Sequence, residues 1–159
     1  EGEDVRARYH DEYGGRSDID GIMTGRELMV RFVEEDSFCV SPGMQFVRKS
    51  FLDKVGLRFY EGIVHEDNLF TCLMLALAPR TGFLNESLYV RRVRRGSTMT
   101  EDREIKHVYG HFKAAYEIEA WLRVHVGSAR RRSSAFCCVM WRSATIGRRS
   151  MPCRSMRRN

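Results

Sequence analysis

The chain lacks a Cys-x-x-Cys pair, although it contains five cysteines in 159 residues. Without such a pair a structural zinc site is not expected, and an odd number of cysteines argues against a disulfide framework. Cys39 and Cys72 are therefore expected to pack as small apolar residues. This pattern is typical of a protein from a reducing compartment, which indicates the cytoplasm.

Long apolar runs are also missing. No stretch reaches the roughly 18 uncharged apolar residues of a membrane span, and no secretory signal pattern is visible. The composition is 43% hydrophobic and 30% charged. It predicts one soluble globular unit of ordinary size.

Acidic residues are absent after Glu119, and the forty residues that follow contain ten arginines and no lysine. Removing those ten from the 27 basic residues leaves 17 against 21 acidic groups in residues 1–119, a net charge of −4. We interpret residues 1–126 as the folded unit and residues 127–159 as an Arg- and Ser-rich tail. Such a tail can bind nucleic acid or anionic lipid. An unstructured segment, or out-of-frame translation of a GC-rich gene, is the plainer explanation.

The most informative segment is FYEGIVHEDNLFT, residues 59–71, in which adjacent carboxylates precede an uncharged apolar run. That run, residues 69–78, stops at a proline and predicts a buried helix. Glu66 and Asp67 are then expected at the positive end of the helix dipole, at the rim of a core. Helix capping is the common role for such residues, and catalysis is the alternative.

An arginine-rich segment follows in residues 88–95, and its β-compatible residues predict a strand over 88–93. Arg92 and Arg94 would lie on one face of it, near the turn at Gly96 and Ser97. Two guanidinium groups can chelate a phosphate there. A solvated basic edge strand is the alternative.

Shorter patterns predict the remaining elements. A capping box at residues 24–27 opens a helix through about Glu35, whose inward residues are Leu28, Phe32 and Val33. A strand is expected over 44–47, a helix over 49–55 that ends at Gly56, and a strand over 81–84.

A second capping box, at residues 98–101, predicts a long helix after it. Apolar residues recur there at a spacing of three to four: Ile105, Val108, Tyr109, Phe112, Tyr116 and Leu122. Glu104, His107 and His111 share another face, with a spacing that can bind a metal. Without a third firm ligand, we expect an exposed polar face instead.

Three segments occur in the order and spacing of one known family. They are RKSFL and GLRF within residues 46–59, GIVHEDNLF within residues 59–71, and LYVRRVRRGSTM within residues 88–100. Together they resemble the C-terminal half of bacterial family-2 glycosyltransferases of the GT-A fold, over roughly residues 24–100. Arg91 departs from the pattern, because an aromatic residue is common at its place.

The resemblance implies roles for individual residues. Asp67 matches the general base that takes the proton from the acceptor hydroxyl, with Glu66 as the neighbouring catalytic carboxylate and His65 as a substrate-binding neighbour. The same resemblance implies that the leaving diphosphate is stabilised by Arg92, Arg94 and Ser97.

The resemblance also implies an α/β fold, the acceptor-side half of a GT-A domain with mixed strands and helices, followed by a disordered basic tail. The expected activity transfers a sugar from a nucleotide-sugar donor to a hydroxyl of a glycan or lipid-linked acceptor, in cell-surface polysaccharide synthesis. Its expected place is the cytoplasm, at the inner face of the cell membrane, and nucleic acid is not the expected partner. The alternative is an inactive fragment whose basic tail binds nucleic acid or anionic lipid without specificity.

Two features of the family's donor-binding half are missing: a Gly- or Ser-bearing first strand-to-helix turn and an Asp-x-Asp motif after an apolar strand. Residues 18–20 do spell Asp-x-Asp, but they lie in a turn-rich stretch that predicts a surface loop. We therefore expect the chain to be part of a longer transferase and inactive alone. The full-length enzyme is expected to use a divalent cation, Mg or Mn, which these residues do not hold firmly.

Overall fold

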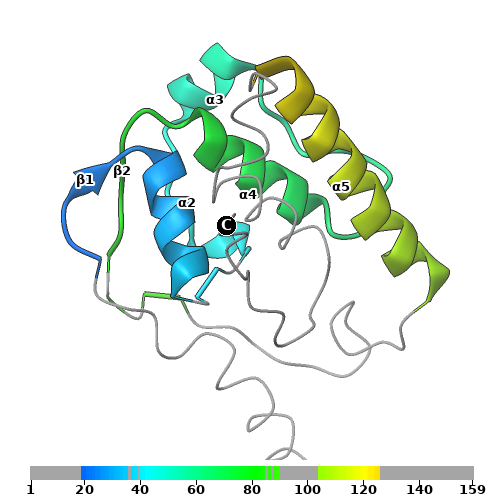
Figure 1. Ribbon diagram of the computed structural model, residues 1–159, viewed down its shortest axis with the longest axis horizontal. Helices are drawn as coiled ribbons and strands as arrows, with labels where there is room; N and C mark the ends of the chain where they lie inside the picture. The colour runs from blue at the N-terminus through cyan, green and yellow to red at the C-terminus, as the bar shows by residue number, and fades with distance from the viewer. Residues whose placement is uncertain are drawn as a thin grey trace, which may run out of the picture.

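The computed structural model describes residues 19–35, 37–38, 40–84, 86, 88–89 and 104–125. This part of the chain is mixed α/β, mostly helical with a small two-stranded sheet (Figure 1). Its elements in chain order are β1 (Ile22–Met23), α2 (Gly25–Glu34), the 3-10 turn η1 (Pro42–Met44), α3 (Lys49–Val55), α4 (Glu66–Leu77), β2 (Thr81–Gly82) and α5 (Ile105–His125). None of the helices described combines the length and apolar character that crossing a membrane requires.

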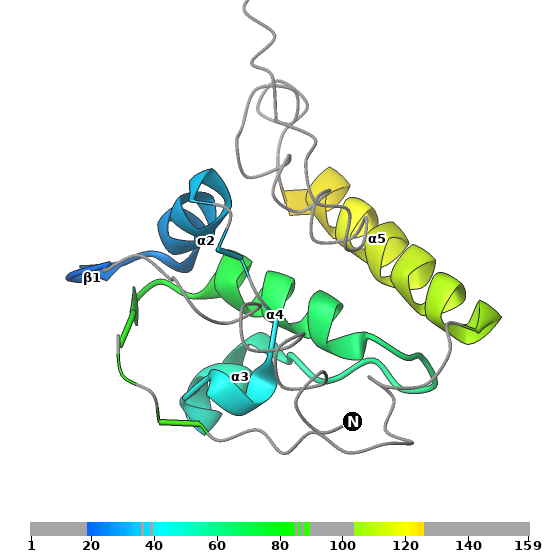
Figure 2. The ribbon, with the colours of Figure 1, turned by 90° about the horizontal axis from the view of Figure 1, so that it is seen from below.

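Helix α4 is the central element, with α2 packed on one side and α5 on the other (Figures 1 and 2). Its sequence carries no charge after the first turn, so burial on several sides costs no ion desolvation. Eight of its residues are buried: Asn68, Leu69, Phe70, Thr71, Cys72, Met74, Leu75 and Ala76. The predicted buried helix is confirmed, and Cys72 is fully buried as expected.

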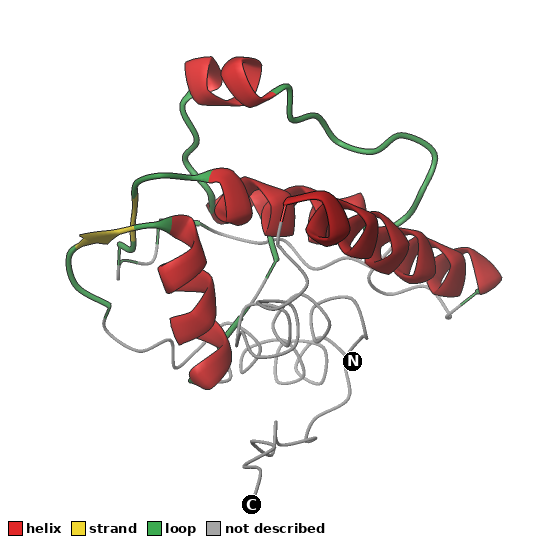
Figure 3. Ribbon diagram, turned by 45° about the horizontal axis from the view of Figure 1, so that its top comes forward, coloured by secondary structure: helices red, strands yellow, loops and turns green. Residues whose placement is uncertain are grey.

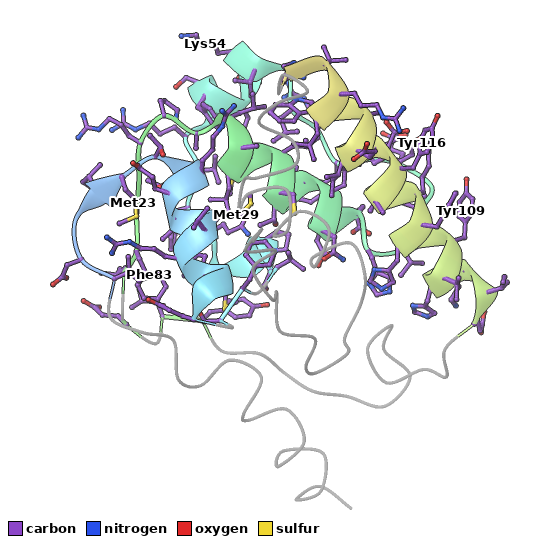
Figure 4. All side chains as sticks on the ribbon, viewed as in Figure 1. Met23, Met29, Lys54, Phe83, Tyr109 and Tyr116 are labelled. Atoms are coloured by element: carbon purple, nitrogen blue, oxygen red, sulfur yellow. The ribbon has the colours of Figure 1, made fainter. Side chains whose placement is uncertain are left out.

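The apolar core forms where α2 and α5 meet α4. From α2 it receives Leu28, Met29 and Phe32, and the rings of Phe32 and Phe83 meet edge to face at 5.7 Å. Figure 4 shows Met29 on the side of α2 that faces the interior. The inward placement of Leu28 and Phe32 is confirmed, whereas the side chain of Val33 lies outside the described residues.

The predicted capping box opens α2. The Thr24 backbone N–H donates to Glu27 Oε2 at 2.8 Å, and the Glu27 N–H donates back to Thr24 Oγ1 at 3.3 Å. The next residue, Gly25, donates its N–H to the Ala78 carbonyl at 2.9 Å, just past the end of α4. A Cβ on Gly25 would collide with the Leu75 carbonyl, so glycine allows the start of α2 to touch the α4 backbone.

The sheet is smaller than predicted. Strands β1 and β2 pair antiparallel, with Ile22 opposite Gly82 and Met23 opposite Thr81, so the strand predicted over 81–84 covers only two residues. The strand predicted over 44–47 is wrong: Pro42 opens a 3-10 turn there, and Phe46 is 91% exposed. Of the strand predicted over 88–93, residues 88 and 89 are in loop and the rest lie outside the described residues.

Helix α3 matches its prediction and lies at the edge of the core, against which Phe51, Leu52 and Val55 pack with partly buried side chains. It ends at Gly56, whose φ of 66° is the left-handed conformation that glycine adopts without a steric penalty. None of its residues is fully buried. Figure 3 shows α3 joined to the other helices by loops on both sides, and Figure 4 shows Lys54 directed away from the molecule.

Helix α5 is present as predicted. Of the six apolar residues that recur along it at a spacing of three to four, however, five are 55–82% exposed: Ile105, Val108, Tyr109, Phe112 and Tyr116. The buried face is instead His107, Gly110, Ala114, Ile118 and Leu122. Figure 4 shows Tyr109 and Tyr116 pointing away from α4. At Gly110 the backbone of α5 touches the Val64 carbonyl in the turn before α4, so no larger side chain fits at that position.

Candidate functional site

His65 adopts a backbone conformation that few side chains tolerate. It is the residue immediately before α4, and its φ of 69° is the one positive value for a non-glycine residue among those described. Histidine visits this left-handed region more readily than most residues, yet the conformation still costs on the order of 1 kcal/mol. Its side chain makes no capping hydrogen bond to the helix. The His65 ring therefore does not cap α4, which is the common role of a side chain at this position.

Glu66 and Asp67 lie in the first turn of α4, as predicted. The surroundings of Asp67 change the pKa of its carboxyl group. Burial raises the pKa of the Asp67 carboxyl, and the negative charge of Glu66 raises it further. The backbone N–H groups of Asn68 and Asp67 lower this pKa in part. Asp67 Oδ1 is buried and has no hydrogen-bond partner among the described residues. A carboxylate in this state favours accepting a proton.

Two histidines of α5 meet His65. The Nε2 atom of His65 lies 3.0 Å from Nδ1 of His107, within hydrogen-bond distance. His111, one turn further along α5, stacks on the His65 ring with centroids 3.8 Å apart and an interplanar angle of 21°. The His65 imidazole is thus held at one ring nitrogen by His107 and on one face by His111.

The close approach of α5 depends on Gly110. This glycine lies between the two histidines on the buried face, and a Cβ there would collide with the Val64 carbonyl. Glycine in the middle of a helix normally costs about 1 kcal/mol relative to alanine. At this position it allows the α5 backbone to rest on the turn before α4. That contact brings His107 and His111 to His65.

Three of the predicted site residues, His65, Glu66 and Asp67, are consecutive in the sequence, and the structure places them at the start of α4. The other three, Arg92, Arg94 and Ser97, lie outside the described residues. In the described part of the chain, no group of three or more His, Cys, Asp or Glu side chains is arranged to hold a metal ion. The Mg or Mn ion that the resemblance implies for the full-length enzyme stays a prediction.

The expectation of an exposed polar face on α5 is wrong for His107, which is only 7% exposed. Glu104 does lie exposed, paired with Lys106 at 3.3 Å. The spacing of His107 and His111 placed them on one face correctly. Their partner was not recognisable, because His65 is 42 residues away from His107 in the sequence.

Taken together, the site consists of a carboxylate with a raised pKa at a helix start and an imidazole clamped two residues before it. A carboxylate accepts a proton from a hydroxyl within hydrogen-bond reach, and an imidazole donates or accepts a hydrogen bond to orient the same hydroxyl. Catalytic groups with perturbed pKa values are commonly found in such surroundings.

Comparisons with protein-family models, with curated proteins and with solved structures find no match to this chain.

Proposed function

We propose that this chain forms the acceptor side of a glycosyltransferase, in which Asp67 is the general base. The observation that carries the proposal is the state of that carboxylate. Its pKa is raised by burial, and its Oδ1 atom is buried without a hydrogen-bond partner among the described residues. A base works best when its pKa lies closer to the working pH, and an oxygen without a hydrogen-bond partner is not committed to another donor.

In the proposed reaction, a sugar is transferred from a nucleotide-sugar donor to a hydroxyl of a glycan or lipid-linked acceptor. Asp67 accepts the hydroxyl proton as the oxygen attacks the sugar carbon, and the nucleoside diphosphate leaves with the electron pair of the bond that breaks. Glu66 keeps the pKa of Asp67 high through its charge. His65 binds the acceptor beside the base. The divalent cation expected for the full-length enzyme, Mg or Mn, would be held by residues outside those described.

The sequence motifs in residues 46–71 support this assignment, since they resemble the acceptor-side half of the family-2 enzymes of GT-A fold. From the same resemblance, we propose that the protein works in the cytoplasm, at the inner face of the cell membrane. We also propose that the donor diphosphate is held by groups outside the described residues. Activity is therefore tested in a longer protein that carries a nucleotide-binding half in frame with this chain.

The decisive variant is Asp67→Asn, which removes the base but keeps its shape. We expect the initial rate of transfer at saturating donor to fall by about 10²–10⁴-fold, the usual contribution of a positioned general base. The matched control is Glu61→Gln, which changes an exposed carboxylate six residues earlier and should leave the rate unchanged. Asp67→Asn with most of its activity intact would remove Asp67 from the reaction. A collapse of its melting transition would show instead that the carboxylate is structural.

A further inference from the structure

The contact between His65 and His107 determines which of their ring nitrogens carry a proton. The bond between His65 Nε2 and His107 Nδ1 joins two ring nitrogens, so only one of them can carry the shared proton when both rings are neutral. If His65 donates, His107 carries its own proton on Nε2. If His107 donates, the proton of His65 must lie on Nδ1. The two arrangements present different faces of His65 to a ligand.

The surroundings of His107 distinguish these arrangements. Its Nε2 atom is buried, and it has no hydrogen-bond partner among the described residues. If this atom carried a proton, a buried N–H donor would lack an acceptor, and such orphaned donors are rarer in proteins than acceptors left without a donor. The arrangement with a bare Nε2 on His107 is therefore favoured. In it, the Nδ1–H of His107 donates to His65.

We propose that His107 is a positioning residue that fixes His65 as the Nδ1–H tautomer. His107 accomplishes this by donating to His65 Nε2, while the stacked ring of His111 restricts rotation of the His65 imidazole. His65 then carries a hydrogen-bond donor on Nδ1, two residues before the carboxylate of Asp67. That donor is suited to a hydroxyl or phosphate oxygen, and its use on an acceptor sugar rests on the proposed function.

His107 contacts His65 from the buried face of α5 and not from the exposed surface. His107 is buried on the face that meets α4, and Gly110 sets the distance between the helix and the turn that carries His65. The backbone of His65 is in the strained left-handed conformation, and the contacts of its ring with α5 help to hold it there.

The experiment records the ring nitrogens of the histidines by long-range ¹H–¹⁵N NMR on the full 159-residue chain, at a pH where the rings are neutral. A bare ring nitrogen resonates far from one that bears a proton, so each tautomer is read directly. We expect Nδ1 of His65 protonated and its Nε2 bare, with the same tautomer for His107. A His65 ring with its proton on Nε2, or one that averages both tautomers, overturns the proposal even if the chain is folded.

Two variants separate positioning from simple packing. In His107→Asn the amide nitrogen lies as many bonds from Cβ as Nδ1 does, so the donor to His65 is kept. In His107→Gln the amide nitrogen corresponds to Nε2, so the donor is displaced. We expect the Asn variant to preserve the His65 tautomer and the Gln variant to lose it. His125→Asn on the same helix, where the ring is exposed and stacks on Trp121, is the control and should change neither.

These readouts do not depend on activity. A fixed His65 tautomer in this chain, together with no sugar transfer by the longer protein that carries the nucleotide-binding half, would refute the glycosyltransferase and leave the role of His107 intact. An unfixed tautomer in an active transferase would refute the role of His107 alone. If a variant fails to fold, the tautomer of the unchanged protein still decides.

Discussion

At the scale of single residues, the site depends on two that are held in unfavourable states. His65 keeps a left-handed backbone, and Asp67 keeps a carboxylate whose charge is disfavoured by burial and by Glu66. Residues of this kind lower stability. For Asp67, hydrogen bonds from backbone N–H groups favour the charged carboxylate at the helix start, while burial works against the charged form.

The raised pKa of Asp67 predicts a pH-dependent gain of stability in Asp67→Asn. Above the ordinary value of 3.8, the folded state holds this proton more tightly than the unfolded state does, so the carboxylate lowers stability as the pH rises through the folded pKa. Asparagine cannot ionise. The variant should therefore melt a few degrees higher than the unchanged protein at pH 7, and the difference should vanish below about pH 3.8.

Thermal melts between pH 3 and pH 7 measure this difference, with Glu61→Gln as an exposed-carboxylate control that should shift little. A lower melting temperature of Asp67→Asn at pH 7 would contradict the sign, and would show that capping by the charged carboxylate outweighs its burial.

At the scale of elements, α5 shows how a close helix contact overrides the larger apolar pattern. The buried stripe of Gly110, Ala114, Ile118 and Leu122 is less apolar than the stripe that the sequence pattern favours. It packs inward together with a close contact between Gly110 and the Val64 carbonyl, in the turn before α4. The larger apolar side chains are left on the outer face.

The orientation of α5 is tested by two alanine substitutions on opposite faces. Ile118→Ala removes a side chain that is 2% exposed and should cost about 2–4 kcal/mol of unfolding free energy. Phe112→Ala removes a larger side chain that is 66% exposed and should cost less than about 0.5 kcal/mol. Urea unfolding gives both values. The reverse order would mean that the helix is rotated, with the predicted apolar face inward.

At the scale of the whole molecule, stability is concentrated around α4. Both α2 and α5 pack on it, and the buried apolar residues come from these three helices and the segments next to them. Helix α3 contributes no fully buried residue: Phe51, Leu52 and Val55 pack on the core only in part, and its ion pairs, such as that between Asp53 and Arg58, are local and exposed. Exposed pairs of this kind contribute little.

Native-state hydrogen exchange should therefore be uneven along the chain. We expect the amides of residues 70–77 in α4 to exchange most slowly, near the rate set by global unfolding, because both flanking helices must separate to expose them. The amides of α3 should exchange much faster through local opening. Equal protection of α3 and α4 would contradict this division and would mean that α3 belongs to the cooperative core.

Features that depend on local patterns could be predicted from the amino-acid sequence. The uncharged run of α4, the carboxylates in its first turn, the capping box at Thr24 and the end of α3 at Gly56 were all predicted, because each depends on residues within one or two helical turns. The short sheet was predicted less well, since its strands are only two residues long.

Packing between distant segments fixes which face of α5 is buried, and it brings His107 to His65. Two stripes on α5 have a helical spacing, and periodicity alone does not predict which of them is buried. The choice depends on how near two backbones come, which is set by a glycine in one segment and a carbonyl in another. Such a contact is a property of the packed molecule, and it is what assembles the three histidines at the start of α4.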